Sequence, residues 1–521
     1  MARTHTVTRA PHARSGPMPL ERQLAEDDDA LRKLGYQRVL ARRMTLFANF
    51  GVAFSVISVP TGLMVLYPYA LNTGGPAELV WTWLLVGAAS LLVGLGMAEI
   101  CSAFPTCGAL YFWTARLAKR HNNAWAWQTG ILNLTGQVAV TASATYGTAV
   151  FLGGFTTLAW GWTPTTRETF AMFLGPLVIC GLLNTFRVSI VAFLTKLSVW
   201  WNIGTVAMIC AVLGLIPKHH ASAPFVFTHV VNNTGFHSAI YVGAIGLLTS
   251  QWTILGFDGA GHMAEETAGA ARNAPRGIVR SIAVAVIVGY ALILAVTFAI
   301  QPSDYTNEAS GGVSQVFMDA LHSRATTEVL LAGILGAQFT CCMACVTANS
   351  RMIFAFCGRD SAFPLAARWS SVRKGTHTPA AAVWLAIALA LILTVPALWS
   401  PTAFNAVASV STIALYAAHA IPIFLRLRQG DQFEGGPWEL GRWSKPVGIL
   451  ATSWVVVISV VFVLPQTTPI TRDNFNYAGL VLAAVLGLST VWWLAKARHR
   501  FRGVAPQGGV EELLALENGL A

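Results

Sequence analysis

Long apolar runs and short polar segments alternate along the chain. Twelve runs of about 18 or more residues are predominantly apolar, the length that an α-helix needs to cross a bilayer. The apolar positions are continuous rather than alternating, so the pattern predicts helices and not the strands of a membrane barrel. The predicted spans are 44–70, 79–103, 124–153, 169–186, 190–216, 238–262, 279–301, 327–350, 380–398, 403–425, 446–464 and 477–495.

The two ends of the chain lack such runs. Residues 1–43 and 499–521 are polar and charged, and we predict that they form two tails around a membrane domain at 44–498. We expect no removable signal peptide within 1–43, because this segment lacks an apolar core. The composition agrees with a membrane protein: 55% of the residues are hydrophobic and 11% are charged, whereas soluble domains carry about 25% charged residues.

The basic residues are distributed unevenly between the loops. If the N-terminus is cytoplasmic, 30 of the 34 Lys and Arg residues lie inside, and only Arg167, Lys218, Arg324 and Arg472 lie outside. This bias predicts cytoplasmic termini and an even number of spans. The net charge of +11 therefore reflects topology in a lipid bilayer, and we expect no nucleic-acid partner because no basic folded module remains to bind one.

Two predicted spans are interrupted near their middles. The first reads SVPTG at Ser58–Gly62, where Pro60 removes a helix donor and disfavours helix at the preceding residue. The sixth contains GFDG, and we expect unwound backbone at Ser58–Gly62 and at Ile254–Gly259. Paired interruptions of this kind favour an inverted-repeat transporter with a central site. Ordinary kinked helices are the alternative, since Pro and Gly are frequent in membrane spans.

The freed backbone groups and one carboxylate make these interruptions the candidate binding site. Half-helix ends carry partial charges that suit an ammonium or a carboxylate. Asp258 is expected to meet a substrate ammonium or a coupling proton, because an ionisable residue inside a span is a functional candidate by default. A structural bond to freed backbone is the alternative. The candidate substrate-binding residues are Ser58, Val59, Pro60, Thr61, Gly62, Gln137, Trp252, Gly256, Phe257 and Asp258.

Neighbouring residues have two possible roles each. Trp252 and Phe257 are suited to covering a ligand or contacting a quaternary amine, and helix packing is the alternative. His262 and His419 are expected to be hydrogen-bonding groups, with titration near neutral pH as the alternative. One face of the third span is polar and either lines the pathway or bonds to other helices; it carries Asn133, Gln137, Thr141 and Thr148.

Several motifs resemble a known family. The segments SVISVPTG, EICSAFPTCGALYFW, GFDGAGHMAEET followed by NAPRGI, and TANSRMIFAFCGRDSAFP are similar to those of amino acid–polyamine–organocation permeases, more narrowly the amino acid–choline branch with its GABA and choline permeases. The resemblance covers about residues 35–500 and implies an all-α, LeuT-like fold of twelve transmembrane helices with broken helices one and six. The five-plus-five inverted repeats would cover about 44–216 and 238–425, with extra helices at about 446–495.

The resemblance also implies alternating access about a midplane site lined by spans one, three, six and eight. In sodium-coupled relatives, hydroxyls of span eight help to hold the ion, which makes Thr340 and Thr347 candidates here. In some proton-coupled relatives a lysine of span five takes that position, and Lys196 is the candidate, with snorkelling to the interface as the alternative. SVPTG replaces the glycine-serine-glycine break of many α-amino-acid permeases, so carboxylate recognition there is not implied in detail.

Charged groups near the inner ends of the spans suggest a gate. Glu99, at the end of span two, is expected to pair with a residue such as Arg351. A cytoplasmic surface helix with local ion pairs is expected for four further residues, with closure of an inner gate as a second role: Glu265, Glu266, Arg272 and Arg276.

No pattern in the chain indicates an enzyme. The CCMAC segment contains a C-x-x-C pair, but it lies in a span without a matching second pair, so packing is favoured over zinc. We find no nucleophile elbow and no metal-binding cluster, and expect no cofactor. The expected function is a secondary transporter in the plasma membrane for an amino acid or GABA. Choline or a polyamine, or a nutrient sensor on the same fold, are the alternatives, and proton coupling is expected over sodium coupling.

Overall fold

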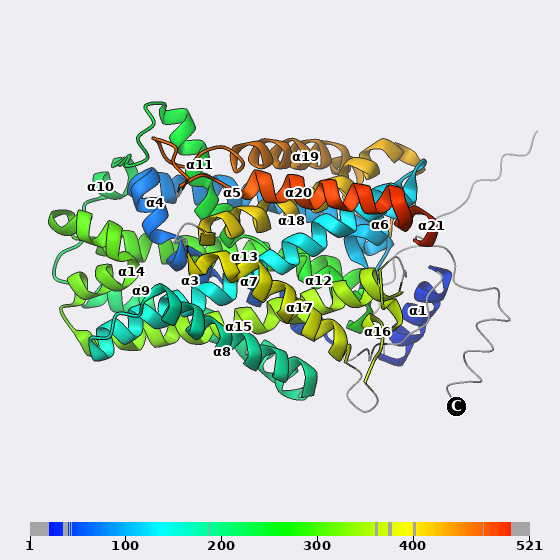
Figure 1. The fold of residues 1–521 in the computed structure, drawn as a ribbon, viewed down its shortest axis with the longest axis horizontal. Coiled ribbons are helices and arrows are strands. Elements are labelled where there is room, and N and C mark those ends of the chain that lie inside the picture. The colour runs from blue at the N-terminus through cyan, green and yellow to red at the C-terminus, as the bar shows by residue number, and fades with distance from the viewer. Residues whose placement is uncertain are drawn as a thin grey trace, which may run out of the picture.

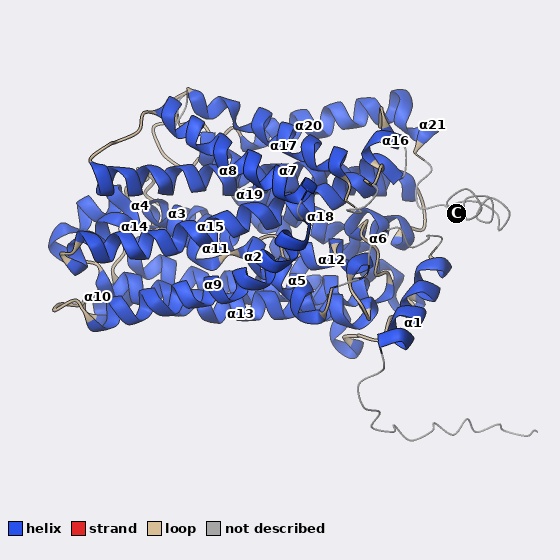
Figure 2. Ribbon diagram, turned by 90° about the horizontal axis from the view of Figure 1, so that it is seen from below, coloured by secondary structure: helices blue, strands red, loops and turns tan. Residues whose placement is uncertain are grey.

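The computed structural model describes residues 20–34, 40, 42, 44–186, 188–359, 363–373, 378–399, 403–472 and 474–501. Within these residues every regular element is a helix, apart from an isolated parallel bridge between Met44 and Thr267. Figure 1 shows that the long helices run roughly along the longest axis of the molecule, and Figure 2 shows the same bundle from below. The prediction of an all-α membrane protein is confirmed.

Eleven helices of the described residues are long and apolar enough to cross a membrane. The first is interrupted and consists of α2 (Leu46–Ile57) and α3 (Val59–Val65). The other ten are α5 (Gly75–Ala103), α7 (Asn122–Trp160), α8 (Thr166–Phe186), α9 (Val188–Leu215), α13 (Ala270–Ala299), α15 (Arg324–Ile353), α17 (Ala380–Thr394), α18 (Ala403–Gln429), α19 (Ser444–Val461) and α20 (Ala478–Trp492).

The run predicted as the sixth span, 238–262, is divided into two helices. Helix α11 (Ala239–Thr253) ends before a non-helical stretch at 254–258, and α12 (Gly259–His262) follows it. Neither piece alone has the length of a span. This division explains why twelve apolar runs correspond to eleven long helices.

Short helices lie at the two ends of the bundle. Figure 1 shows α1, α16 and α21 at one end, and α4, α10 and α14 at the other. We call the first the basic end, because Arg351 and Arg426 lie in the last turns of α15 and α18 there, and the second the opposite end. The short α-helices are α1 (Leu20–Lys33), α4 (Tyr67–Thr73), α6 (Ala109–Leu117), α10 (Ala223–Thr228), α14 (Tyr305–Leu321), α16 (Ala366–Trp369) and α21 (Arg498–Arg500). Short 3-10 or π turns are η1 (Ala264–Glu266), η2 (Pro302–Asp304), η3 (Phe354–Arg359), η4 (Val395–Leu398), η5 (Gly430–Gln432), η6 (Gly441–Trp443) and η7 (Trp493–Ala497).

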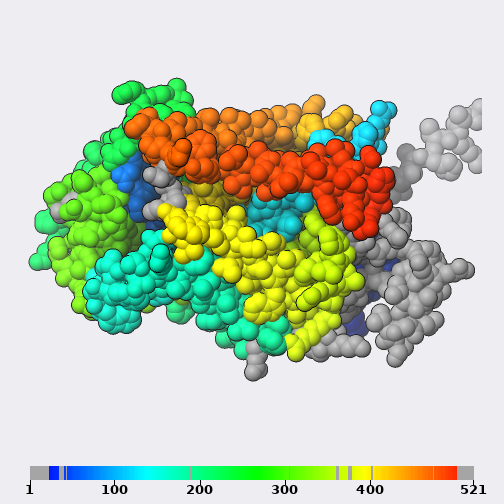
Figure 3. All heavy atoms as spheres, viewed as in Figure 1, coloured from blue at the N-terminus to red at the C-terminus, as the bar shows by residue number. Residues whose placement is uncertain are grey.

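Helices α19 and α20 form the outer layer on one side, where Figure 3 shows them in orange and red. Their outward side chains are apolar, including Val456, Leu488 and Val491, which are 59%, 72% and 65% exposed. A soluble protein rarely exposes continuous apolar surface of this kind, whereas lipid chains accept it.

Helix α7 occupies the centre of the bundle. It packs against α6, α8, α15, α17, α18 and α20, and it also contacts α3. Helix α13 packs against α2, α3, α5 and α12, so the interrupted helices lie among the buried helices of the bundle. Buried polar groups in such a place need internal partners, and the partners define the candidate site.

Candidate functional site

The first interruption consists of a single residue. Ser58 has φ 36° and ψ 69°, a left-handed conformation, and its N–H donates to the Phe54 carbonyl at 3.0 Å to end α2. Helix α3 begins at the next residue, because Pro60 lies in its first turn, where a fixed φ suits a helix start. The expectation of unwound backbone through Gly62 is therefore wrong: the N–H groups of Thr61 and Gly62 already bond to the Ser58 carbonyl, at 2.9 and 3.1 Å.

Helix α9 holds this interruption through neutral side chains. The Ser58 hydroxyl donates to Asn202 Oδ1 at 2.9 Å, and the hydroxyls of Ser55 and Ser198 bond to each other. All four residues are buried. Lys196 lies on a different face of α9 and is exposed, so the residues of the predicted fifth span that reach the first interruption are Ser198 and Asn202.

The second interruption is longer and contains a charged group. Gly256 has φ +86°, which a side chain rarely adopts. Tyr416 of α18 donates its hydroxyl to the Ile254 carbonyl at 2.6 Å and so satisfies one acceptor at the end of α11. Helix α12 resumes when the His262 N–H donates to the Asp258 carbonyl at 3.0 Å. Asp258 thus lies at the junction between free backbone and the second half-helix.

The two interrupted helices meet through glycines. A Cβ placed on Gly256 would lie 2.1 Å from Val56 Cγ1, in the last turn of α2. A Cβ placed on Gly62 would lie 2.8 Å from both Cγ2 and Oγ1 of Thr253, the last residue of α11. Each interruption therefore receives the last turn of the other helix at a position where a larger residue does not fit. This crossing brings both breaks to one place in the bundle.

Asp258 is surrounded by polar groups from three directions. Its Oδ2 accepts a hydrogen bond from Gln137 Nε2 of α7 at 2.8 Å. The same oxygen lies 3.4 Å from His262 Nε2 and 3.7 Å from His419 Nε2 of α18. The carboxylate and both imidazoles are 0% exposed, and Asp258 Oδ1 has no hydrogen-bond partner among the described residues. We call Asp258, His262 and His419 the buried acid–imidazole cluster.

The aromatic candidates lie in different surroundings. Phe257 is fully buried, and its ring centroid lies 5.0 Å from that of His419 and 6.0 Å from that of Tyr416. Trp252 instead meets Phe404 of α18 edge-on at 5.9 Å. Phe257 therefore packs against the buried acid–imidazole cluster, and Trp252 faces a different part of α18.

The polar stripe of the third span bonds to neighbouring helices. Gln137 reaches Asp258, as described above, and Asn133 Nδ2 lies 3.2 Å from His262 Nε2. The other two members face α15: Thr141 and Thr148 hydroxyls lie 3.2 Å from Asn349 Nδ2 and Cys342 Sγ respectively. All four side chains therefore lie within bonding distance of neighbouring helices, and Gln137 does so at the carboxylate between the two interruptions.

The hydroxyl candidates of the eighth span already have partners. Thr340 donates to the Ala337 carbonyl of its own helix at 2.8 Å, and Thr347 donates to Asn184 Oδ1 of α8 at 2.7 Å. The group of α15 that reaches the first span is the thiol of Cys341, which donates to the Val56 carbonyl at 3.2 Å.

The charged residues expected at the gate form different pairs. Glu99 lies 3.3 Å from Arg426 Nε and accepts a hydrogen bond from the Ser444 hydroxyl at 2.6 Å. Arg351 Nε lies 2.9 Å from Glu266 Oε1. The expected Glu99–Arg351 pair is therefore wrong, because the ends of α5 and α18 are the ones that adjoin.

The expected surface helix with local ion pairs is also wrong. Glu265 is 3% exposed, and its carboxylate accepts the Cys107 N–H at 2.9 Å. Glu266 pairs with Arg351 in the last turn of α15, while Arg272 and Arg276 lie in α13 and are exposed. The acidic residues therefore tie segments together at the basic end instead of facing water.

Helix α1 docks over this region at the basic end. The Asp27 carboxylate accepts the N–H groups of Gly269 and Ala270, at 2.7 and 3.0 Å, at the start of α13. Arg42 pairs with Asp28 at 2.7 Å. Burial raises the pKa of Asp27 above its ordinary value, although Arg42 and the two amides act in the other direction. These contacts tie α1, η1, α13 and α15 together at the basic end.

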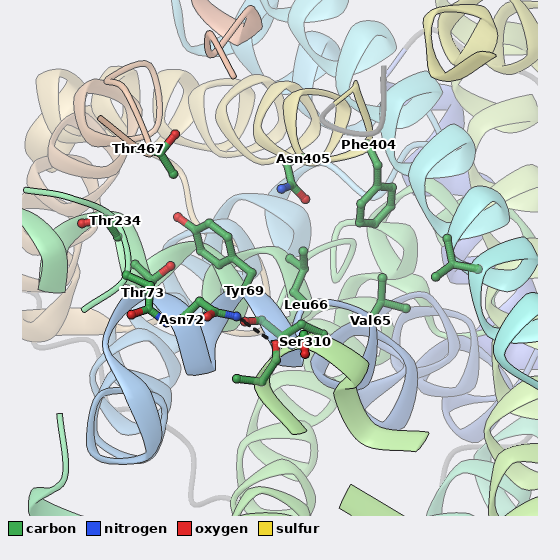
Figure 4. A pocket seen from close by; sticks show the side chains of 14 residues that line it. Val65, Leu66, Tyr69, Asn72, Thr73, Thr234, Ser310, Phe404, Asn405 and Thr467 are labelled. Carbon is green, nitrogen blue, oxygen red and sulfur yellow. Dashed lines mark hydrogen bonds between the residues drawn. The ribbon is translucent and has the colours of Figure 1, made fainter. Parts of the chain in front are cut away.

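A cavity of about 360 Å³ opens at the opposite end (Figure 4). Several of its polar side chains already bond to protein groups: Asn72 Nδ2 donates to the Pro68 and Ala309 carbonyls, both at 2.8 Å, and the Tyr69 hydroxyl donates to the Ile245 carbonyl at 3.0 Å. The lining residues are uncharged: Val65, Leu66, Pro68, Tyr69, Asn72, Thr73, Val150, Asn233, Thr234, Ala309, Ser310, Phe404, Asn405 and Thr467. These residues were not predicted, because isolated neutral residues at helix ends give no signal in the sequence.

Two buried polar atoms, on side chains that lie near residues lining the cavity, have no hydrogen-bond partner among the described residues. Gln338 of α15 donates its Nε2 to a carbonyl of α7 at 2.7 Å, which leaves Oε1 without a donor. Gln338 and the cavity residue Val65 lie against the same glycine, Gly147. Trp252 Nε1 is the second atom, and its ring meets the cavity residue Phe404. The sequence analysis did not predict Gln338; its amide within the apolar eighth span was the signal available for it.

The geometry gathers some of the predicted residues and separates others. The interruptions at Ser58 and Gly256, together with Gln137 and Asp258, lie at one crossing in the core. Glu99 lies at the basic end and Lys196 on an exposed face. Among the described residues, no group of three or more His, Cys, Asp or Glu side chains is arranged to hold a metal ion.

Comparison with known proteins gives a consistent result. A sequence model of a family described as amino acid permease matches residues 45–486. The chain is 39% identical over 492 residues to the amino-acid permease BAT1 homolog of Oryza sativa subsp. japonica, covering 91% of this chain and 94% of the relative. It is 37% identical over 495 residues to amino-acid permease BAT1 of Arabidopsis thaliana, covering 91% and 95%.

A fungal protein is similar over a comparable length. Amino-acid permease 2 of Neurospora crassa is 31% identical over 484 residues, covering 91% of this chain and 88% of the relative. The match therefore extends over the interrupted helices, the cavity and the outer helices alike.

Proposed function

The chain belongs to the amino acid permease family, and on this premise we propose that it moves an amino acid or GABA across the membrane by alternating access. The family match and the eleven long apolar helices show that the chain is a multi-pass membrane transporter related to amino acid permeases. The proposal of alternating access for an amino acid or GABA rests on one observation: two interrupted helices cross in the core beside a buried carboxylate. The substrate-binding role of Ser58, Val59, Pro60, Thr61, Gly62, Gln137, Trp252, Gly256, Phe257 and Asp258 is part of this proposal.

Two buried polar atoms without partners, on side chains near residues that line the cavity, favour a zwitterion. Trp252 Nε1 is a donor without an acceptor, and Gln338 Oε1 is an acceptor without a donor. A carboxylate would accept from the indole, and an ammonium would donate to the amide oxygen, so an amino acid or GABA satisfies both. Choline offers neither a carboxylate nor an N–H group, and a polyamine offers only donors. These two unpartnered atoms therefore favour an amino acid or GABA over choline or a polyamine as the substrate.

A closed basic end and an open cavity support alternating access. The ion pair between Arg351 and Glu266, and the docking of Asp27 at the start of α13, cover one end. The cavity with Asn72 and Asn405 in its wall opens at the other. We propose that the basic end is cytoplasmic, that both termini lie there, and that the protein resides in the plasma membrane. Reporter enzymes active only outside the cytoplasm, fused to each terminus, should be inactive at both.

We propose proton coupling in preference to sodium coupling. A sodium ion at the first span would need free carbonyl and hydroxyl oxygens. Here the Val56 carbonyl already accepts a hydrogen bond from the Cys341 thiol at 3.2 Å. We assign the coupling role to Asp258, and not to Thr340, Thr347 or Lys196.

Uptake into proteoliposomes tests the function. Purified protein is reconstituted and supplied separately with radiolabelled L-alanine, L-glutamate, L-arginine, GABA, choline and putrescine, with an imposed pH gradient and then with a sodium gradient. We expect uptake of at least one amino acid or GABA, driven by the pH gradient. Binding of an amino acid in a thermal-shift assay without any uptake would instead support the sensor, and uptake of choline or putrescine alone would overturn the proposed substrate class.

A further inference from the structure

The hydrogen bonds around the buried acid–imidazole cluster fix the protonation of only one of its four ring nitrogens. His262 Nδ1 lies 3.0 Å from the Cys107 carbonyl, which can only accept, so Nδ1 carries a proton. His262 Nε2 therefore faces Asp258 Oδ2 at 3.4 Å either as a bare lone pair or as a second N–H group. Neither ring nitrogen of His419 has a hydrogen-bond partner among the described residues.

The charge of the cluster depends on one proton. With both imidazoles neutral, Asp258 is a fully buried anion, and no Lys or Arg among the described residues forms an ion pair with it. A buried unpaired charge is costly, whereas a buried pair with hydrogen bonds is much less so. One added proton on either imidazole turns the cluster into a neutral ion pair. Its distances of 3.4 and 3.7 Å exceed those of charge-assisted hydrogen bonds, about 2.7–2.9 Å, so protonation is expected to draw the groups together.

Asn133 is placed to respond to this proton. Its Nδ2 lies 3.2 Å from His262 Nε2, an arrangement that suits the neutral ring, and its Oδ1 has no hydrogen-bond partner among the described residues. Rotation of the amide would present Oδ1 to an Nε2–H group. The surroundings thus contain a suitable partner for each protonation state of His262.

Other titratable groups near the cluster are already engaged. Tyr416 donates its hydroxyl to a backbone carbonyl, and Glu265 accepts the Cys107 N–H. Arg351 is paired with Glu266 at the basic end. From α7 the facing groups are amides, and from α2 the residue that bonds to α12 is also an amide, Asn49. The proton is therefore left to Asp258, His262 and His419.

The cluster connects elements that a transport cycle would separate. Asp258 and His262 lie on the second half-helix, and His419 lies on α18. Helix α12 leads directly into η1, whose Glu266 closes the basic end through Arg351. A proton that joins Asp258 to His419 would thus hold α12 against α18, and its loss would weaken that contact beside the gate.

We propose that Asp258, His262 and His419 form one proton-binding site that couples proton movement to transport. In the binding step an N–H bond forms between a ring Nε2 and a proton from water on the side of the cavity. In the release step the same bond breaks and the proton passes to water at the basic end, with no change of oxidation state. The coupling rests on the proposed function, whereas the proton-binding site does not.

A spectroscopic experiment tests the site without transport. Protein with ¹⁵N-labelled imidazoles is reconstituted in lipid, and solid-state NMR spectra are recorded between about pH 5 and 8, where imidazole ordinarily changes charge. His262→Gln and His419→Gln assign the two rings. We expect a single titration shared by both rings, altered in the second ring when the first is replaced and lost in Asp258→Asn. Rings that remain neutral throughout, or titrate independently of Asp258, would overturn the proposal.

A flux experiment tests the coupling. Proteoliposomes containing a pH-sensitive dye report proton entry when the amino acid identified by the uptake screen is added. We expect His262→Gln and His419→Gln to reduce proton-driven uptake about tenfold or more and to flatten its pH dependence, while exchange of internal for external amino acid continues. His237→Gln, an exposed histidine in the loop before α11, is the matched control and should behave as wild type.

The two experiments separate the possible failures. If wild-type protein transports no amino acid, the proposed function fails and NMR alone decides the site. If transport occurs and both variants retain wild-type proton entry, the coupling is overturned. His419 has no side-chain hydrogen bond to lose, so His419→Gln is the variant more suited to retaining the fold, and size-exclusion chromatography verifies this.

Discussion

The two interruptions differ in length. At the first interruption one residue, Ser58, leaves the helix, whereas at the second interruption, in the predicted sixth span, the whole stretch 254–258 is non-helical. Both are held by a glycine that receives the other helix: Gly62 receives Thr253, and Gly256 receives Val56. The side chain at the first interruption is the Ser58 hydroxyl, which bonds to Asn202. The charged side chain at the second interruption is the carboxylate of Asp258.

This difference in chemistry indicates different roles for the two interruptions. A neutral hydroxyl–amide pair keeps its bond whether the surroundings gain or lose a proton. A buried carboxylate beside two imidazoles changes its charge balance with one proton or one ligand ammonium, and each state favours a different arrangement. We therefore expect the first interruption to act as a fixed wall of the site, and the second interruption to change its conformation during transport.

The largest effect is expected at Asp258. Asp258→Asn keeps the shape of the side chain and the possibility of a bond to Gln137, but removes the charge that faces the two imidazoles. We expect uptake to fall at least tenfold, which corresponds to about 1.4 kcal/mol, with normal expression and a folded protein. Loss of amino acid binding in a thermal-shift assay would indicate that Asp258 meets the substrate ammonium, whereas normal binding with a flattened pH profile would indicate a proton.

The matched control removes a carboxylate outside the site. Asp319 of α14 accepts a hydrogen bond from Gln315 at 2.8 Å toward the opposite end, and Asp319→Asn should transport as wild type does. Near-normal binding, uptake and pH profile in Asp258→Asn would reduce Asp258 to a structural residue and remove the contrast between the two interruptions.

The positions of both interruptions follow from local sequence rules. Pro60 and Gly256 disfavour a continuous helix at these two points, and the continuous apolar runs around them predict membrane helices. Proline alone does not decide this, because Pro176, Pro275 and Pro422 lie inside α8, α13 and α18. The extent of the first break also followed from a local rule, because a proline in the first turn favours helix after it. Applying that rule would have limited the break to Ser58 and avoided the prediction of unwound backbone through Gly62.

The partners of the charged residues depend on which helices adjoin, and the spacing of residues along the chain does not contain this information. Glu99 and Arg351 each lie at a helix end, and only the packing of α5 against α18 assigns Arg426 to Glu99. His419 is far from Asp258 in sequence, yet its ring lies 3.7 Å from the carboxylate. The candidate site was thus predictable at its backbone breaks and not in its long-range side-chain contacts.

The next largest effect is expected at Gly256. In Gly256→Ala the new Cβ would lie 2.1 Å from Val56 Cγ1 and would occupy a left-handed conformation, which costs about 1–2 kcal/mol for a residue with a side chain. We expect a lower melting temperature and a severalfold loss of uptake. Val56→Ala in the same chain removes the contacting methyl groups and should recover part of the loss, but not the part due to backbone strain.

Recovery to full stability in that double variant would mean that the positive φ has little cost. No recovery at all would mean that Val56 is not the obstacle, and the direct contact between the two interruptions would be disproved.

Gly62 should be less sensitive than Gly256. The Cβ of Gly62→Ala would lie 2.8 Å from Cγ2 and Oγ1 of Thr253 and 3.0 Å from its Cα, but the backbone conformation there suits alanine. We expect a smaller loss of uptake than for Gly256→Ala, and partial recovery when Thr253→Ala removes the two nearest atoms. Loss of uptake in Gly62→Ala greater than in Gly256→Ala would reverse the order that the packing implies, and would show that contact with Thr253 is not the main constraint at Gly62.

The smallest effects are expected at Ser58, where two terms oppose each other. Ser58→Ala loses the hydrogen bond to Asn202 and leaves a buried acceptor without its donor, which costs about 1–3 kcal/mol, while the left-handed strain stays. Ser58→Gly loses the same bond but relieves strain of about 1–2 kcal/mol. We therefore expect thermal unfolding to show Ser58→Gly close to wild type and Ser58→Ala below it, with uptake reduced less than in any Asp258 variant. A glycine variant less stable than the alanine variant would show that Ser58 is not strained, and uptake as poor as in Asp258→Asn would show that the first interruption is more than a fixed wall.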